Sequence, residues 1–312
     1  MKRKTKLFVA LGAAATAVAG AAVYAGKLMS DLAIRREPPK GPAVSFDGGD
    51  PEVGESRVKM ALAAVEGLET ERVEMVSYDG LKLVADWLRC EEPKRVVIAM
   101  HGWRSAWQVD FGCQLAFLQK EGCAVLLPHQ RAQGESEGAY MGFGTTERLD
   151  CVGWIYKAIE EYPDLPIYLY GISMGAATVM MTTGLTLPDN VKGIIADCGY
   201  TSPKAIWKHC IRKVLPSGAA DGVGLVSRGF AMQNAGVDGN ISAKDALADN
   251  RLPILFIHGD DDQFVPIEMG YENFRAAGGD KEMLVVPGAG HAMAYHTDPE
   301  AYEAAVRRLF AK

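Results

Sequence analysis

The chain has 312 residues, of which 48% are hydrophobic and 23% are charged, and its formal net charge is −6 at pH 7. This composition is typical of a globular protein with a substantial core and argues against a disordered chain. With an acidic balance and no Lys/Arg-rich run beyond the first six residues, the chain has no basic surface for nucleic acid, and we expect no such partner.

The N-terminus carries the basic sequence MKRKTK, followed by twenty uncharged residues from Leu7 to Gly26. A membrane-spanning helix needs about 20 residues, whereas the apolar core of a signal peptide has about 7–15. We therefore expect residues 1–26 to be a signal-anchor. Cleavage of a signal peptide near Val23-Tyr24-Ala25, giving a secreted protein, and a buried helix are the alternatives. The clustered N-terminal cations favour a folded domain on the extracytoplasmic side.

Residues 27–54 are rich in Pro, Gly and charge, which predicts a linker between the membrane segment and a folded domain at 55–312. The run ESRVKMALAAVEGLE has helical spacing. The next run, VEMVSYDGLKLVADWLRC, alternates around Asp79-Gly80 and predicts a β-hairpin.

Short apolar runs then alternate with helix-like stretches such as WQVDFGCQLAFLQKEG and TERLDCVGWIYKAIEEY. The strand-like runs are RVVIAMHGW, CAVLLPHQ, PIYLYG, VKGIIADCG, LPILFIHGD and EMLVVPGAG. Apolar strands that alternate with helices predict an α/β fold whose mostly parallel sheet is covered on both faces.

Six cysteines are present, without CxxC spacing or a metal-type pairing with histidine, and we expect buried free thiols. Neither GxxxxGK[ST] nor a GxGxxG sequence that opens a helix occurs. The sequence therefore predicts no metal and no cofactor.

Ser173 lies in YLYGISMGAAT, between the strand-like PIYLYG and a helix-like run that begins SMGAATV. In this context Gly171-Ile172-Ser173-Met174-Gly175 predicts a nucleophile elbow, a sharp turn that presents the serine hydroxyl. Gly171 and Gly175 permit the turn because larger side chains would collide there. A serine in a purely structural turn is the alternative.

A nucleophilic serine needs a base and a carboxylate that orients the base. His291 follows the last strand-like run, at the sheet edge where functional groups of open α/β folds gather, and is the expected base. The order Ser…Asp…His places the acid before His291. The loop HGDDDQFVP offers Asp260, Asp261 and Asp262, and Asp197 at the end of an earlier strand is the alternative.

Stabilising the developing oxyanion requires preset backbone N–H groups. Met174 follows the serine directly, and Trp103 follows His101-Gly102 at the end of a buried strand. We expect the amides of Trp103 and Met174 to form the oxyanion hole.

From about Val73 to Phe310 the chain resembles the serine α/β-hydrolase superfamily. It is most similar to a bacterial, often membrane-anchored branch, through the motifs HGW, QRAxGESEG, GxSMG, DCGYTS, HGDxDxFVP and GAGH. The resemblance implies an α/β-hydrolase fold and a triad of Ser173, Asp262 and His291. Asp262 is the matching acid because it stands three residues before Val265.

The chain departs from the family at two places that are not triad positions. His129 and Gln133 stand in HQRAQGESEG, where the family commonly reads DQRAHGESEG. Between them, Arg131 is expected to hold loops together rather than to bind substrate.

Residues 201–250 form an insertion at the position where members of this superfamily carry a cap. We expect aromatic and apolar side chains of this region to line a pocket, namely Trp107, Tyr200 and Trp207, with Trp103, Phe230 and Met232. Packing of the insertion onto the domain is the alternative for each of them.

The sequence as a whole predicts a membrane-anchored serine hydrolase that cleaves a small-molecule carboxylic ester through an acyl-serine. A serine peptidase or acyl-peptide hydrolase of the same fold is the enzymatic alternative. A catalytically silent, membrane-tethered binding protein is the alternative from another class, and the intact set of Ser173, Asp262 and His291 argues against it.

Overall fold

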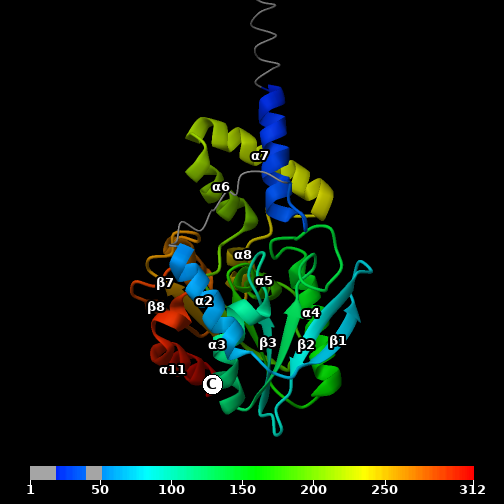
Figure 1. The fold of residues 1–312 in the computed structure, drawn as a ribbon, viewed down its shortest axis with the longest axis vertical. Coiled ribbons are helices and arrows are strands. Elements are labelled where there is room, and N and C mark those ends of the chain that lie inside the picture. Colours follow the sequence, from blue (N-terminus) through cyan, green and yellow to red (C-terminus); the bar gives the residue numbers. More distant parts are fainter. Residues whose placement is uncertain (1–18, 40–50) are drawn as a thin grey trace, which may run out of the picture.

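A computed structural model describes residues 19–39 and 51–312 of the chain (Figure 1). Most of the expected membrane segment and residues 40–50 of the expected linker lie outside the described residues. A sheet domain occupies the lower part of the view, and several helices protrude from one end of it.

The sheet has eight strands in the order β1-β2-β4-β3-β5-β6-β7-β8. β2 is antiparallel to both of its neighbours, and β4 through β8 pair in parallel. The strands are β1 (Glu71–Val76), β2 (Lys82–Leu88), β3 (Arg95–Met100), β4 (Cys123–His129), β5 (Ile167–Ile172), β6 (Val191–Asp197), β7 (Ile254–Gly259) and β8 (Lys281–Val286). The predicted α/β fold with a mostly parallel sheet is confirmed, as is the hairpin around Asp79-Gly80.

Helices alternate with the strands as the sequence pattern predicts. They are α2 (Pro51–Ala64), α3 (Trp107–Lys120), α4 (Glu147–Glu161), α5 (Met174–Thr182), α6 (Pro203–Val214), α7 (Ser217–Ala235), α8 (Ala243–Ala248), α9 (Ile267–Ala276), α10 (Ala294–Thr297) and α11 (Pro299–Phe310). α6 begins at a local signal, because Ser202 caps the amide of Ala205 and is followed by proline. α11 begins in the same way with Asp298 and Pro299.

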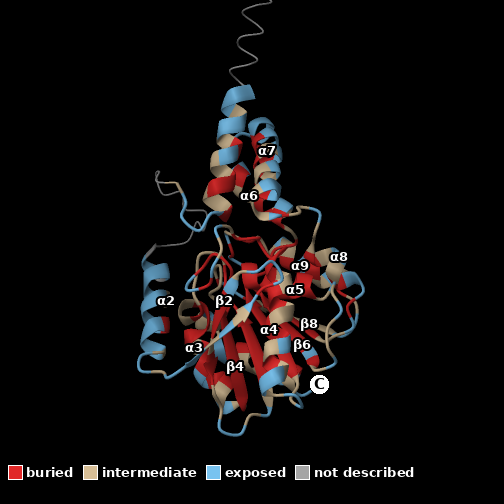
Figure 2. Ribbon diagram, turned by 90° about the vertical axis from the view of Figure 1, so that its right-hand side faces the viewer, coloured by how far each residue is buried: buried red, intermediate tan, exposed pale blue. Residues whose placement is uncertain are grey.

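The core lies on both faces of the sheet, which is why the central strands are apolar throughout (Figure 2). On one face, β3 side chains such as Val97 pack with Phe111 of α3 and Leu309 of α11. On the other face, Ile98 of β3 belongs to a cluster that includes Trp154 of α4 and helix α5.

Loops on the α4 side of the sheet are held by Arg131. Its guanidinium donates to Asp150 of α4 at 2.6 Å and to Asp79 of the β1–β2 turn at 2.9 Å. Arg131 therefore has the bracing contacts expected of it, and bidentate geometry suits the guanidinium group to this task.

The insertion between β6 and β7 contains α6, α7 and α8. Helices α6 and α7 protrude from the sheet domain, whereas α8 packs against α5 and α9 of the domain itself (Figures 1 and 2). We call α6 and α7 the cap helices.

Residues 19–34 form a helix, which we call the N-terminal helix, beside the cap helices (Figures 1 and 2). The linker expected from residue 27 is therefore absent at residues 27–34, because Met29, Leu32 and Ala33 give this part of the helix an apolar face and Ile34 is fully buried in the core. The expected linker also overlaps the start of α2 at residue 51. Over the described ranges, none of the helices combines the length and apolar character needed to cross a bilayer.

Candidate active site

Ser173 occupies the turn between β5 and α5, with φ 56° and ψ −116°. This left-handed backbone is strained for a residue with a Cβ and is the geometry expected of a nucleophile elbow. A Cβ at Gly171 would lie 2.2 Å from the carbonyl oxygen of Gly175, and one at Gly175 would lie 1.8 Å from that of Met100. Only glycine at both positions lets the strand and helix approach closely enough to form the turn.

The hydroxyl of Ser173 lies at one end of a chain of hydrogen bonds. Its Oγ is 2.8 Å from Nε2 of His291, and Nδ1 of that ring is 2.7 Å from Oδ2 of Asp262. The structure thus brings together the three residues that the sequence predicted as a triad. They come from the ends of β5, β7 and β8, where parallel strands direct their loops to one edge.

Asp262 is held in a fixed orientation inside its loop. Its Oδ1 accepts the amides of Phe264 at 2.9 Å and Val265 at 2.8 Å, which leaves Oδ2 for His291. Burial alone would raise the pKa of Asp262, but His291 and His258 hold that pKa well below its usual range. The carboxyl group is therefore ionised, and it fixes the proton of His291 on Nδ1 and the free lone pair on Nε2.

His258 supports this loop from the end of β7. Its Nε2 is 2.8 Å from the carbonyl oxygen of Val265 and 3.4 Å from Oδ2 of Asp262. Although burial lowers the pKa of His258, its contacts with Asp262 raise it overall. His258 therefore holds the acid loop.

The turn after β3 brings backbone amides next to Ser173. A Cβ on Gly102 would lie 3.3 Å from the Cβ of Ser173, so the peptide that leads into Trp103 lies against the serine. Met174 opens α5, where the first N–H groups have no acceptor within the helix. The two amides expected to form an oxyanion hole thus belong to segments that adjoin the serine.

Two buried side chains, those of His101 and Asp110, fix this turn, and Asp110 was not predicted from the sequence. The ring of His101 accepts the amide of Gln130 on Nε2 at 3.2 Å and donates from Nδ1 to the carbonyl oxygen of Gly102 at 2.8 Å. Burial lowers the pKa of His101, which keeps the ring neutral as this pattern requires. Asp110 of α3 accepts the amide of Gly102 at 2.6 Å and the guanidinium of Arg57 of α2 at 2.5 Å. An acidic residue in the first turn of a helix is too common a pattern to have identified Asp110.

The other candidate acids lie outside this arrangement. Asp260 and Asp261 are exposed. Asp197 is buried at the end of β6, and its Oδ2 accepts the hydroxyl of Tyr302 at 2.9 Å rather than a histidine. Burial raises the pKa of Asp197 to about 6, because Tyr302 and the nearby histidines offset only part of the desolvation.

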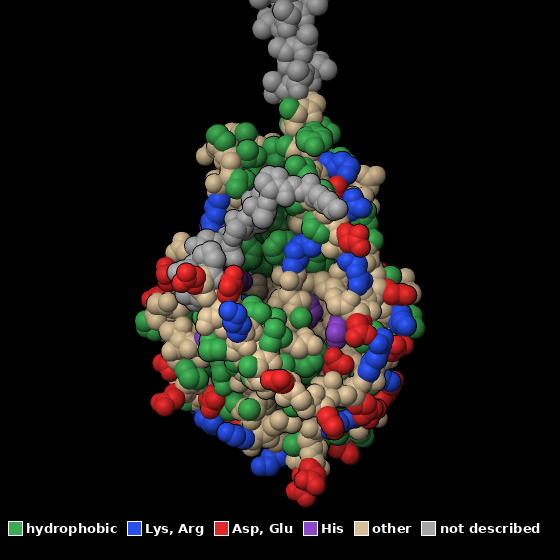
Figure 3. All heavy atoms as spheres, viewed as in Figure 1, with side chains coloured by type: hydrophobic (Ala, Val, Ile, Leu, Met, Phe, Trp, Pro, Cys, Tyr) green, Lys and Arg blue, Asp and Glu red, His purple; other side chains and the backbone are tan. Residues whose placement is uncertain are grey.

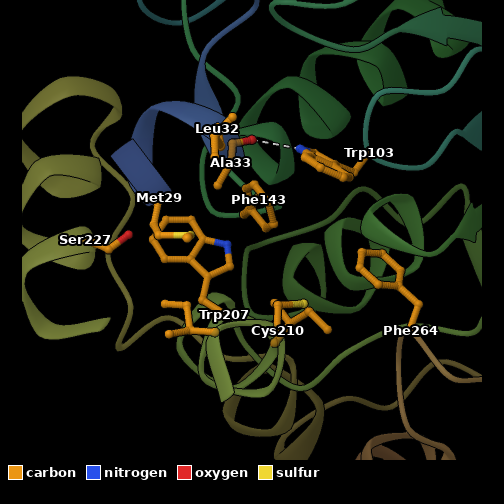
Figure 4. A pocket seen from close by; sticks show the side chains of 11 residues that line it. Met29, Leu32, Ala33, Trp103, Phe143, Trp207, Cys210, Ser227 and Phe264 are labelled. Carbon is orange, nitrogen blue, oxygen red and sulfur yellow. Dashed lines mark hydrogen bonds between the residues drawn. The ribbon is translucent and has the colours of Figure 1, made fainter. Parts of the chain in front are cut away.

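An apolar cavity of about 50 Å³ lies next to the triad, between the sheet domain, the cap helices and the N-terminal helix (Figure 4). Its lining residues are Met29, Leu32, Ala33, Trp103, Phe143, Ile206, Trp207, Cys210, Ile211, Ser227 and Phe264. In the space-filling view, hydrophobic side chains gather beneath the protruding helices (Figure 3).

Of the aromatic and apolar residues expected to line a pocket, Trp103 and Trp207 line this cavity and the others do not. Trp107 is buried on the α3 side of the sheet and donates to Asp86 at 2.8 Å, because the first turn of α3 faces the core. The hydroxyl of Tyr200 donates to the carbonyl oxygen of Phe143 at 3.0 Å, and Tyr200 does not line the cavity. Phe230 and Met232 of α7 are not among the lining residues, and Met232 is 54% exposed. Met29, Leu32 and Ala33 were missed because they were assigned to the linker.

Among the described residues, one group of side chains has the proximity of a metal site: ligand atoms of Cys198, Asp262 and His291 lie within 4.8 Å of one another. Burial holds the pKa of the Cys198 thiol well above its usual range, whereas metals bind the thiolate. Asp262 and His291 are also already paired with each other. These residues therefore do not fit a resident metal ion. All six cysteines are free, and Cys123, Cys151 and Cys198 are buried.

Comparisons with known proteins agree with this architecture. A family model described as serine aminopeptidase, S33, matches residues 91–220. A curated relative, the uncharacterized protein YqkD of Bacillus subtilis (strain 168), is 26% identical over 193 residues, which are 60% of this chain and 62% of that protein.

Solved structures are similar over most of the chain. The esterase Pf2001 of Pyrococcus furiosus has a TM-score of 0.64 at 22% identity, with 89% of this chain and 97% of that chain covered. Est1E from Butyrivibrio proteoclasticus, solved with ferulic acid bound, has a TM-score of 0.57 at 19% identity, with coverage of 77% and 100%.

The sheet order, the flanking helices and these similarities define the fold. The protein has the α/β-hydrolase fold.

Proposed function

We propose that this protein is a serine hydrolase that cleaves carboxylic esters through an acyl-serine intermediate. The observation that carries the proposal is the continuous hydrogen-bonded series Ser173 Oγ, His291 Nε2, His291 Nδ1 and Asp262 Oδ2. A neutral imidazole with its lone pair on Nε2 is the base that a serine hydroxyl requires.

The acylation step follows from this order of atoms. Oγ of Ser173 attacks the ester carbonyl carbon while Nε2 of His291 takes the hydroxyl proton, and the carbonyl π electrons move to oxygen. The amides of Trp103 and Met174 donate to that oxyanion. The tetrahedral intermediate then collapses, the C–O bond to the alcohol breaks, and His291 returns the proton to the leaving alcohol.

Deacylation repeats the same steps with water. His291 takes a proton from water, the hydroxide adds to the acyl carbon, and the bond to Oγ breaks as the serine regains its proton. The ionised Asp262 holds the imidazole tautomer and stabilises the imidazolium in both halves.

The lining of the cavity favours esters over peptides. The family model is described as an aminopeptidase, and an aminopeptidase must bind a free ammonium group close to the reacting carbonyl. None of the eleven described residues that line the cavity is charged, so an ammonium group placed there would be buried without a partner. An acyl group fits such a lining, and Pf2001, one of the structural neighbours, is an esterase.

We also propose that residues 1–26 retain the protein in a membrane, with the hydrolase domain on the extracytoplasmic side. The support is the uncharged stretch from Leu7 to Gly26 behind a basic N-terminus.

Labelling with a fluorophosphonate tests the nucleophile. The full-length protein should be labelled, Ser173→Ala should abolish the labelling, and Ser217→Ala, which alters an exposed serine at the start of α7, should leave it intact. Labelling that persists in Ser173→Ala would place the nucleophile elsewhere. A wild-type protein that is itself unlabelled would favour a catalytically silent binding protein.

A panel of substrates then distinguishes an esterase from a peptidase. We expect p-nitrophenyl esters of short and medium acids to be turned over with much higher kcat/KM than aminoacyl p-nitroanilides. A reversed preference would favour the aminopeptidase that the family description names.

A further inference from the structure

The apolar cavity begins at the catalytic residues. The ring of Phe264 meets the ring of His291 edge-on, with centroids 4.9 Å apart, and stacks on Trp103 with centroids 6.3 Å apart. Trp103 in turn follows Gly102, which lies against Ser173. A group bonded to Oγ of Ser173 would therefore enter the cavity between Trp103 and Phe264.

The other end of the cavity lies at the N-terminal helix and the cap helices. In Figure 4, Trp103 and Phe264 stand on one side of the cavity, and Met29, Trp207 and Ser227 stand on the other, with Phe143 between them. This gives the cavity a direction, from the serine towards the face of the N-terminal helix that carries Met29.

The C-terminal end of the N-terminal helix is fixed to the active-site turn. The indole Nε1 of Trp103 donates to the carbonyl oxygen of Ala33 at 2.7 Å. The guanidinium of Arg104 donates to the carbonyl oxygens of Leu32 at 3.0 Å and Arg35 at 2.6 Å. These bonds satisfy the carbonyl groups that a helix leaves unpaired at its end.

The same segment is also joined to the loop after β4. The amide of Met141 donates to the carbonyl oxygen of Ile34 at 2.6 Å, and the amide of Arg36 donates to that of Ala139 at 2.9 Å. With Ile34 fully buried, this part of the chain belongs to the folded core.

Further towards the N-terminus, the helix packs closely on α7. A Cβ on Gly26 would lie 2.5 Å from Cγ1 of Val226 and 3.1 Å from the backbone nitrogen of Ser227. The helix side chains of Ala25 and Met29 also pack against the cap cluster of Ile211, Ala220 and Val223. The helix is therefore fixed at its C-terminal end and at residues 25–29.

We propose that the N-terminal helix is one wall of an acyl-binding site and that Met29 sets the length of acyl chain that the site accepts. The ligand class is the apolar acyl group of an ester, since the walls carry no charge and, apart from Cys210 and Ser227, consist of apolar and aromatic side chains. This inference rests on the proposed function, because the acyl group is the part of the substrate that remains on Ser173.

Chain-length selectivity of the full-length protein tests the proposal. Each additional methylene buried in an apolar site raises kcat/KM about fourfold until the site is full. Met29→Trp fills the far end and should lower the kcat/KM ratio of p-nitrophenyl octanoate to butanoate about tenfold or more, which corresponds to about two lost methylene contacts. Met29→Ala opens that end and should shift the preferred acyl chain towards longer acids.

Tyr24→Trp is the matched control, because Tyr24 lies on the same helix but is 71% exposed and outside the cavity. It should keep the wild-type ratio. If both Met29 variants also keep the wild-type ratio, the N-terminal helix is not a wall of the site. Because one substitution enlarges the side chain and the other reduces it, the second variant still tests the proposal if the first fails to fold.

A binding measurement separates failure of this proposal from failure of the proposed function. Ser173→Ala protein should bind saturated carboxylic acids, with affinity that rises with chain length until the site is full, and Trp103 and Trp207 in the walls allow tryptophan fluorescence to report the binding. Met29→Trp in the Ser173→Ala background should shorten the longest acid that gains affinity. This result would support the acyl site even if no ester were hydrolysed, and binding without dependence on chain length or on residue 29 would overturn it.

Discussion

Replacement of Asp262 by asparagine tests the order of the hydrogen bonds at the active site. In the wild type, Oδ1 of Asp262 accepts two amides, from Phe264 and Val265, and Oδ2 accepts from Nδ1 of His291. The asparagine carbonyl oxygen must take the Oδ1 position, because an amide NH₂ there would face two N–H donors. The NH₂ group then points at His291.

The magnitude follows from the tautomer that this arrangement imposes. An NH₂ group opposite Nδ1 of His291 requires a lone pair on Nδ1 and moves the ring proton to Nε2, where it faces Oγ of Ser173. The imidazole can then no longer accept the serine proton. By analogy with other triads we expect kcat to fall by up to about 10⁴, which corresponds to about 5.4 kcal/mol in the activation free energy.

The assay is kcat for p-nitrophenyl butanoate, with the thermal unfolding midpoint measured in parallel to show that each variant is folded. Asp260→Asn and Asp261→Asn are the matched controls, since both residues lie on the same loop and are exposed. Their kcat values should remain within about tenfold of the wild type, as expected for solvated charges. Asp197→Asn should also retain activity, because Asp197 bonds Tyr302 and not His291. A severe loss in Asp197→Asn with a mild effect in Asp262→Asn would refute the assignment and place the acid on β6.

Three further predictions concern stability and location. The folded-state pKa of Asp197 is raised from 3.8 to about 6, so the contribution of this residue to stability is fully present below about pH 4 and is lost as pH rises through 6. Asp197→Asn should therefore raise the free energy of unfolding by on the order of 3 kcal/mol at pH 8 and hardly at all at pH 4. Urea unfolding that gives the larger gain at pH 4 would contradict this sign. Gly175→Ala should prevent accumulation of soluble, folded protein, because the new Cβ would collide with the backbone of Met100. Gly222→Ala in α7 is the control, because no atom lies within 4 Å of the new Cβ, and it should raise the free energy of unfolding by up to about 1 kcal/mol, measured by thermal unfolding. Full-length protein should remain in the membrane fraction after carbonate extraction and retain its own N-terminus, while a soluble protein that begins near Gly26 would indicate a cleaved signal peptide.

The parts of the site predicted from the sequence are those in which local chemistry fixes the geometry. Ser173 lies between two glycines that only an elbow requires, and His291 follows a strand whose end must reach the same sheet edge. Asp262 was harder, because three consecutive acids differ only in which side chain the loop turns inward. The two backbone amides that hold Asp262 in place depend on that folded loop.

The missed features depend on contacts between distant segments. Met29 and Ile34 are apolar residues in a stretch rich in charge and proline, and only their packing against the turn after β3 and the cap shows that they belong to the core. Likewise, Arg57 and Asp110 are separated by 53 residues, and nothing in either local sequence indicates their pairing. Trp107 is the opposite case: it was expected to line the pocket, but its side chain packs in the core on the α3 face of the sheet.

The position of the N-terminal helix has a practical consequence for how the protein is handled. The chain ends at Lys312, just after α11 and at the opposite end of the molecule from this helix (Figure 1). A purification tag or a surface attachment at Lys312 keeps clear of the cavity, whereas a fusion close to the helix brings its bulk next to Met29. A shortened protein that starts at residue 51 would lack a wall of the cavity altogether, and assays with it would report on a different site.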